Sequence, residues 1–259
     1  MSTILSSIQA YDVALLLVVT GQAALVAYLP TPAMKAWAIT VPLPFTLASL
    51  SLGIQVDGSH LIGMWLLFGF TLAVWYLHAR RRWPILPVIV GCAVAYCLLA
   101  TTILGVIGPA TRELLWWPLA ILVAAAGMRL FERLPRANEP AHRSPVPLWL
   151  KVPILLLVVS MLIALKHQLQ GAMTLFPMVG VIACYEARHS LWTQVRQIPV
   201  IMVSILGMLT GMRAAAAAGL GLVAGLAVGW LIYAIIILLL HRQRSAVDAR
   251  IAAEAADAA

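Results

Sequence analysis

Residues 198–240 read IPVIMVSILGMLTGMRAAAAAGLGLVAGLAVGWLIYAIIILLL, a run in which Arg213 is the only charged side chain. A helix that crosses the hydrocarbon core of a bilayer needs about 20 apolar residues, so this run is too long for one crossing. We therefore predict two membrane helices here, at 198–215 and 217–240, joined by a turn near Gly219.

The whole chain has the same character. Of its 259 residues, 63% are hydrophobic and 10% are charged, whereas a soluble domain has roughly 45–50% apolar and about 25% charged residues. This composition excludes soluble, disordered and collagen-like classes. It also argues against a nucleic-acid partner, because the net charge of +8 is better explained by the orientation of membrane helices. The expected fold class is all-α: a single polytopic integral membrane domain, 1–259, with the lipid bilayer around it.

Apolar runs between charged or Pro/Gly-rich breaks predict nine membrane spans. They are 11–30, 34–55, 59–78, 84–107, 113–131, 146–165, 171–187, 198–215 and 217–240. A polar linker, 132–145, follows the fifth span, and a tail, 241–259, follows the ninth. No basic segment precedes the first apolar run, so we expect no cleaved signal peptide.

The basic residues give these spans a direction. With the N-terminus outside, 14 of the 17 Lys and Arg residues fall on the cytoplasmic side, and Arg112, Lys166 and Arg213 fall outside. Short cytoplasmic loops carry an excess of positive charge, so this split predicts an N-out, C-in topology. The preference for Arg over Lys and the high alanine content suggest a bacterial inner membrane.

Nine spans with one unpaired helix suggest an inverted repeat of four, one and four helices. The first half is 1–108, the connecting helix is 113–131, and the second half is 146–240. The second helix of each half carries a proline break, at Pro42 and Pro44 and at Pro177. Many secondary transporters have discontinuous helices in matching positions of two inverted halves.

An acid and a histidine recur after each break. Asp57 precedes His60 by three residues, and Glu186 precedes His189 by three residues. We interpret these four as candidate proton-coupling residues, with Glu186 as the acid nearest to membrane depth, where a carboxylate is costly and commonly functional. The alternative for Glu186 is an interfacial ion pair with Arg188 or Arg196.

The prolines mark a candidate solute site between the second and seventh spans, because a proline in a membrane helix frees a backbone carbonyl that something must satisfy. The alternative is a structural kink. Polar side chains near the breaks would line a path, or would bond back to their own helices. The candidate solute-binding residues are Pro42, Pro44, Thr46, Ser49, Gln55, Thr174, Pro177 and Arg213. Arg213 would hold an anionic group or extend to the membrane boundary.

Glycines spaced by four residues, Gly221, Gly225 and Gly229, predict close contact between helices, either within the chain or across a homodimer. No Cys, His or acidic residues have metal-ligand spacing, and no nucleotide motif occurs, so we expect neither a metal nor a cofactor.

The leading interpretation is a secondary transporter, and not an enzyme, that moves a small solute by alternating access. An anionic solute and proton coupling fit Arg213 and Glu186. Two alternatives remain open: a membrane subunit of a larger complex, and an intramembrane enzyme acting on a lipid-like substrate.

Overall fold

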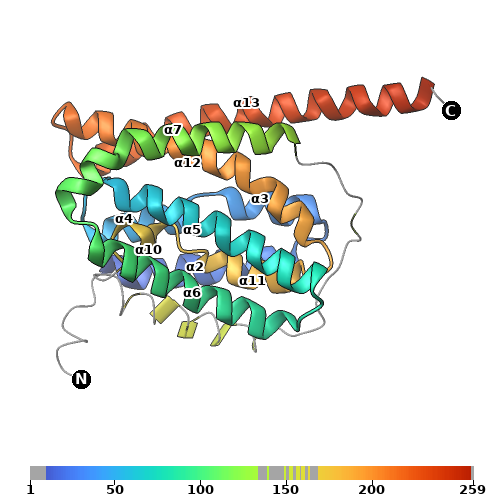
Figure 1. The fold of residues 1–259 in the computed structure, drawn as a ribbon, viewed down its shortest axis with the longest axis horizontal. Helices are drawn as coiled ribbons and strands as arrows, with labels where there is room; N and C mark the ends of the chain where they lie inside the picture. Colours follow the sequence, from blue (N-terminus) through green and yellow to red (C-terminus); the bar gives the residue numbers. More distant parts are fainter. Residues whose placement is uncertain are drawn as a thin grey trace.

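The computed structural model describes residues 10–133 and 169–257, together with scattered positions between 134 and 168. Every regular element in this part is a helix (Figure 1). The helices are α2 (Ala10–Tyr28), α3 (Pro32–Thr40), α4 (Leu43–Leu52), α5 (Gly58–Trp75) with a π-helical turn η1 (Tyr76–Arg80), α6 (Ile85–Val106), α7 (Pro109–Arg133), α10 (Gly171–Thr174), α11 (Met178–Glu186), α12 (Leu191–Ala217) and α13 (Leu222–Asp257).

Six of these helices are long and apolar enough to cross a membrane, which supports an integral membrane protein. They are α2, α5 with η1, α6, α7, α12 and the Leu222–Gln243 part of α13, and they match the first, third, fourth, fifth, eighth and ninth predicted spans. The second and seventh predicted spans are each two short helices. The sixth predicted span and the linker lie mostly outside the described residues. Residues 1–9 and Lys166 also lie outside them.

Two helices are longer than predicted. Helix α12 begins at Leu191 and not at residue 198, and the Glu139 carboxylate accepts hydrogen bonds from the N–H groups of Trp192 (3.1 Å) and Thr193 (2.7 Å) in its first turn. These N–H groups have no partner inside the helix, so the carboxylate stabilises the early start. Helix α13 continues through the predicted polar tail to Asp257, where alanines are frequent and no glycine or proline interrupts it.

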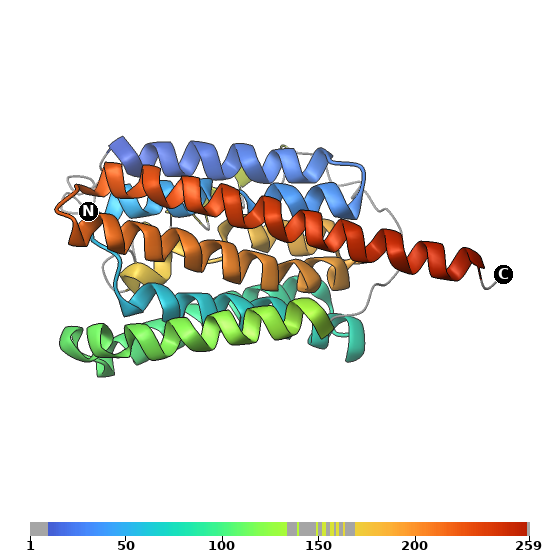
Figure 2. The ribbon, with the colours of Figure 1, turned by 90° about the horizontal axis from the view of Figure 1, so that it is seen from above.

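The two ends of the bundle differ in charge. Helices α5 and α7 end where α3, α6 and α12 begin, and α13 runs past this end of the bundle (Figures 1 and 2). The described basic residues at this end are Lys35, Arg80, Arg81, Arg82, Arg129, Arg133, Arg188, Arg196 and Arg242, while Arg112 and Arg213 lie at the opposite end. The N-out, C-in topology, in which the strongly basic end is cytoplasmic, stays a prediction.

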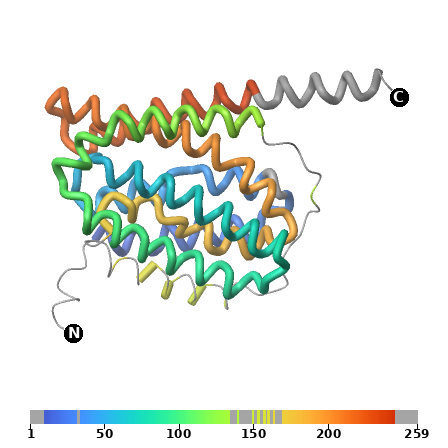
Figure 3. The backbone as a smooth tube through the Cα atoms, viewed as in Figure 1, coloured from blue at the N-terminus to red at the C-terminus, as the bar shows by residue number. Residues whose placement is uncertain are grey.

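Helix α5 lies between two apolar clusters. Its Ile62 and Phe70 belong to a cluster with α2, α6, α10 and α11, and its Leu61 and Met64 belong to a second cluster with α7, α12 and α13. Figure 3 draws the backbone as a tube, in which α12 and α13 form a hairpin along one side. The centre of the molecule is therefore the place where α5 meets the short helices.

The α12–α13 hairpin is built on glycines. Its turn contains Gly219 with φ of 78°, a left-handed conformation that glycine adopts without strain, as predicted. A Cβ atom on Gly229 would lie 2.9 Å from the carbonyl oxygen of Met208 on α12, and one on Gly207 would collide with Ile236. The glycine face that we considered for a homodimer thus packs within the chain, except at Gly221, which has no atom within 4 Å.

We expect Gly229→Ala to destabilise the hairpin by about 1–3 kcal/mol, because the new methyl group would meet backbone, which cannot rotate away. Thermal unfolding of the purified protein in detergent measures this. The control is Gly91→Ala on α6, where no atom lies within 4 Å and alanine favours the helix. An equal loss of stability in both variants would contradict close packing at Gly229.

Candidate functional site

The two short-helix pairs are interrupted in the same way. Pro42 has φ −82° and ψ 40°, and Pro177 has φ −72° and ψ 58°. Both are close to the inverse γ-turn. Each turn is closed across its proline, by Leu43 N–H donating to Val41 O (2.9 Å) and Met178 N–H donating to Phe176 O (2.7 Å). The prediction that both spans are broken is confirmed, and each break is a sharp turn between two helices, not a gentle kink.

Side chains from distant helices satisfy the carbonyl groups at the first break. Pro42 and Pro44 cannot donate to the carbonyl oxygens four residues earlier, those of Ala38 and Thr40. The Gln22 amide on α2 donates to Ala38 O at 2.7 Å and to Val41 O at 3.1 Å. The Tyr233 hydroxyl on α13 donates to Thr40 O.

A second tyrosine binds the chain just before the other break. The Tyr96 hydroxyl on α6 donates to Ala172 O (2.8 Å) on α10 and also reaches Gly63 O (3.2 Å) on α5. Tyr96 and Tyr233 occupy the same position in their helices, each 11 residues after the first helical residue. The roles of Tyr96, Tyr233 and Gln22 were not predicted. Each is a polar side chain inside an otherwise apolar run, and this pattern could have indicated a buried hydrogen bond.

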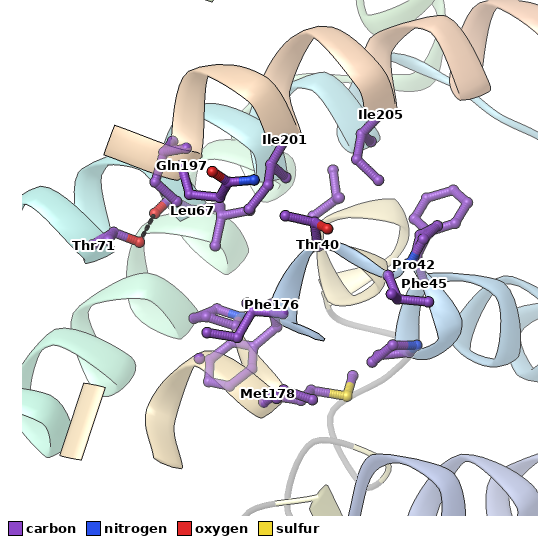
Figure 4. A pocket seen from close by; sticks show the side chains of 18 of the residues that line it. Thr40, Pro42, Phe45, Leu67, Thr71, Phe176, Met178, Gln197, Ile201 and Ile205 are labelled. Atoms are coloured by element: carbon purple, nitrogen blue, oxygen red, sulfur yellow. Dashed lines mark hydrogen bonds between the residues drawn. The ribbon is translucent and has the colours of Figure 1, made fainter. Parts of the chain in front are cut away.

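Between the two breaks lies a cavity of about 100 Å³. Pro42, Pro44 and Phe45 line it from the first break, Phe176 and Pro177 line it from the second, and α5 and α12 complete its wall (Figure 4). An apolar cavity of about 150 Å³ can hold benzene, so this one is large enough for a few waters or one very small molecule.

The lining of the cavity is largely apolar and contains no charged side chain among the described residues. Three hydroxyl groups in it donate within their own helices: Thr40 to Trp37 O (2.7 Å), Thr71 to Leu67 O (3.1 Å) and Thr174 to Gly171 O (2.6 Å). Each hydroxyl oxygen therefore remains available as an acceptor. The first turns of α4 and α11 also border the cavity. Their Leu43 and Met178 N–H groups donate across the prolines, and Pro44 has no N–H group. The N–H groups of Phe45, Val179 and Gly180 remain without a partner inside their helices.

The structure brings half of the predicted solute-binding residues together. Pro42, Pro44, Thr174 and Pro177 all line the cavity. The other four lie elsewhere, and their positions follow from their contacts.

Thr46 faces α13, because its hydroxyl accepts a hydrogen bond from Trp230 Nε1 at 2.8 Å. Ser49 is buried outside the cavity, and Gln55 borders a second, smaller hollow beside the α12–α13 turn. Arg213 forms an ion pair with Glu113 (2.6 Å) and lies over the Trp116 ring (4.8 Å). Its charge is therefore matched by a carboxylate and is remote from the cavity lining.

Glu186 is fully buried as the last residue of α11. The Lys35 ammonium group on α3, itself only 2% exposed, lies 3.5 Å from the Glu186 carbonyl oxygen. In the charge count above, Lys35 is one of the 14 cytoplasmic basic residues, and its burial was not predicted. Arg188 stacks on Tyr185 at 5.0 Å, while His189 is exposed.

Asp57 and His60 lie at the start of α5 and not at the end of the second predicted span. Asp57 is the N-cap of α5: its carboxylate accepts from Ser59 N–H (3.0 Å) and lies 3.1 Å from His60 Nδ1. Burial raises the pKa of Asp57, but hydrogen bonds with His60 and Ser59 outweigh it, so the net pKa lies below its usual value. Asp57 follows Pro42 by 15 residues, whereas Glu186 follows Pro177 by nine. Asp57 and His60 begin α5, whereas Glu186 ends α11, so the two acid–histidine pairs are not at equivalent positions. Their role in proton coupling stays a prediction.

No group of three or more His, Cys, Asp or Glu side chains with the arrangement of a metal site occurs among the described residues. Comparison of the chain with protein-family models, with curated proteins and with solved structures finds no match. Only the helix breaks, the cavity and their side-chain contacts therefore bear on the function.

We expect Tyr96→Phe and Tyr233→Phe each to reduce stability by about 1–3 kcal/mol, because each change leaves a buried carbonyl without its hydroxyl donor. Tyr76→Phe is the control, since the Tyr76 hydroxyl bonds only an exposed arginine, Arg81, in the described part of the chain. Thermal unfolding in nanodiscs compares the three variants. A wild-type melting temperature for both Tyr96→Phe and Tyr233→Phe would show that the breaks need no such donor.

Proposed function

We propose that this chain is a small secondary transporter that binds its solute in the cavity between the two helix breaks and moves it by alternating access. The observation that carries the proposal is the meeting of two breaks with the same proline turn at one cavity. Transporters place solute sites where discontinuous helices of two related halves meet near the bilayer midplane, because irregular backbone is tolerated there only beside protein or a cavity.

Matching features of the two halves support an inverted repeat. Pro42 and Pro177 are 135 residues apart, and the helices that follow begin at similar spacings: α5 and α12 are 133 apart, and α6 and α13 are 137 apart. Tyr96 and Tyr233 correspond as well. Helix α5 packs against α10 of the second half, and α12 packs against α3 of the first half. In this proposal α7 connects the halves and reverses the direction of the second one.

The cavity favours a very small solute with an apolar body and one electronegative group. Its apolar walls would contact the body, and the remaining first-turn N–H groups, those of Phe45 on α4 and of Val179 and Gly180 on α11, would face the electronegative group. The positive ends of two helix dipoles suit a carboxylate without any cationic side chain. An anionic solute thus remains our proposal, but Arg213 no longer contributes to its recognition. Acetate and propionate are suitable first probes.

We expect Ile201→Phe to abolish binding of the probe, because Ile201 lines the cavity and a larger ring would fill it. The matched control is Ile121→Phe, which changes a side chain that is 65% exposed on the outer face of α7. Thermal-shift titration with propionate and uptake of labelled propionate into liposomes, corrected for passive entry, compare the two variants with the wild type.

Ile121→Phe should retain wild-type stabilisation and uptake, and Ile201→Phe should lose at least about tenfold in both. If Ile201→Phe stays folded and its uptake equals that of the wild type, the cavity is not the solute site. Stabilisation only by a co-purified protein would favour a subunit of a larger complex. Chemical conversion of a lipid would favour an intramembrane enzyme.

Glu186 remains our candidate for a coupling group at the basic end. It is buried beside Lys35 and ends α11, whose other end borders the cavity. We expect Glu186→Gln to remove the pH dependence of uptake while uptake down a solute gradient persists, because glutamine preserves size and cannot exchange a proton. Unchanged pH dependence would exclude Glu186 as the coupling group.

A further inference from the structure

Two buried polar atoms near the cavity have no hydrogen-bond partner among the described residues. They are Nε2 of His60 on α5 and Oγ of Ser49 on α4, and both residues are only 1% exposed. A buried polar atom without a partner is unfavourable, and such atoms in proteins commonly face water or an ion.

Phe45 links these two residues to the cavity. Its ring lines the cavity wall and also makes an edge-on contact with the His60 ring, with centroids 6.3 Å apart. Ser49 lies one turn beyond Phe45 on the same face of α4. His60 is therefore separated from the solute site by a single aromatic side chain.

The other ring nitrogen of His60 is connected to the surface. Nδ1 lies 3.1 Å from the Asp57 carboxylate, whose side chain is 25% exposed at the less basic end of the bundle. The two nitrogens thus have different surroundings: Nδ1 lies beside a partly exposed carboxylate, and Nε2 is buried without a hydrogen-bond partner among the described residues.

We propose that His60 is a proton-binding site of the transporter, with Asp57 as its fixed counter-charge and Phe45 as the partition between it and the solute. A proton from water at the outer end binds the neutral imidazole and gives an imidazolium ion beside the Asp57 carboxylate. The pair then has no net charge, which reduces the cost of burying it. Release of the same proton restores the neutral ring. The coupling part of this proposal rests on the proposed function.

The described charged groups on the neighbouring helices have partners of their own. On α10, Gly171 packs against the ring so closely that a Cβ atom there would collide with it. On α7, Arg112 touches Gly58 through its carbonyl group, but its guanidinium group is held by Leu104 O, Ile107 O and Gln170. Glu113 is paired with Arg213 on α12, and Asp12 on α2 accepts from Ser51 of α4.

The capping role of the pair allows a sharp test. Asparagine is as good an N-cap as aspartate, and glutamine at the third helical position preserves a capping box. Asp57→Asn and His60→Gln therefore keep the start of α5 while removing the counter-charge and the proton acceptor. The measurement is ¹⁵N NMR of histidine-labelled protein in nanodiscs between pH 5 and 8, with the His60 resonances identified by their absence from His60→Gln. His241→Gln is the control, since His241 is exposed at the opposite end.

We expect the ring-nitrogen signals of His60 to respond to pH in the wild type and in His241→Gln, and this response to differ in Asp57→Asn, because the proton would be held beside the Asp57 carboxylate. A His60 signal that stays constant from pH 5 to 8, or a transition unaffected by Asp57→Asn, would overturn the proposal and leave only a helix cap.

Ile201→Phe tests the connection to the cavity. Because linkage between two sites is reciprocal, filling the cavity should shift the His60 transition by a measurable amount. An unshifted transition would overturn the coupling while leaving the proton site. This titration needs no solute, so failure of the uptake assays would count against the transporter and not against proton binding at His60.

Discussion

A backbone carbonyl that loses its helical donor inside a bilayer must find another one, because no bulk water is present to replace it. Pro42 and Pro44 create this need twice within three residues, and the chain meets it with Gln22 from α2 and Tyr233 from α13. The first long helix of the described chain and its last one are thereby held against the same turn. The cavity exists because the break is stabilised from outside and is not closed by a continuous helix.

Features that depend on local sequence could be predicted, and features that depend on packing could not. Hydropathy found the six long helices, and proline positions found both breaks, because a helix length and a missing N–H are properties of a few adjacent residues. The left-handed turn at Gly219 belongs to the same class. Gln22 and Tyr233 meet their partners across 16 and 193 residues, and no local pattern shows which helices lie side by side.

The error at Asp57 has a physical cause as well. A spacing of three residues between an acid and a polar residue is also the spacing of a capping box. The residues that follow α4 start a new helix, α5, and do not extend the second predicted span. Arg213 shows a similar limit. Its pairing with Glu113 joins α12 to α7 across 100 residues, and no local pattern predicts such a contact. Both pairs, Asp57 with His60 and Arg213 with Glu113, keep charged groups away from the cavity lining.

The positions of Tyr96 and Tyr233 bear on how such a molecule could move. Each tyrosine lies on the last helix of one proposed half and binds the broken span of the other half: Tyr233 binds Thr40, and Tyr96 binds Ala172. Separating the halves widely would therefore break hydrogen bonds at membrane depth at both breaks, each at the cost of an unsatisfied buried group. A rocking motion about the two turns would preserve both bonds and would change mainly the contacts at the ends. Those ends contain Lys35 with Glu186 on one side and Asp57 with His60 on the other, so the titratable groups lie where alternating access would make and break contacts.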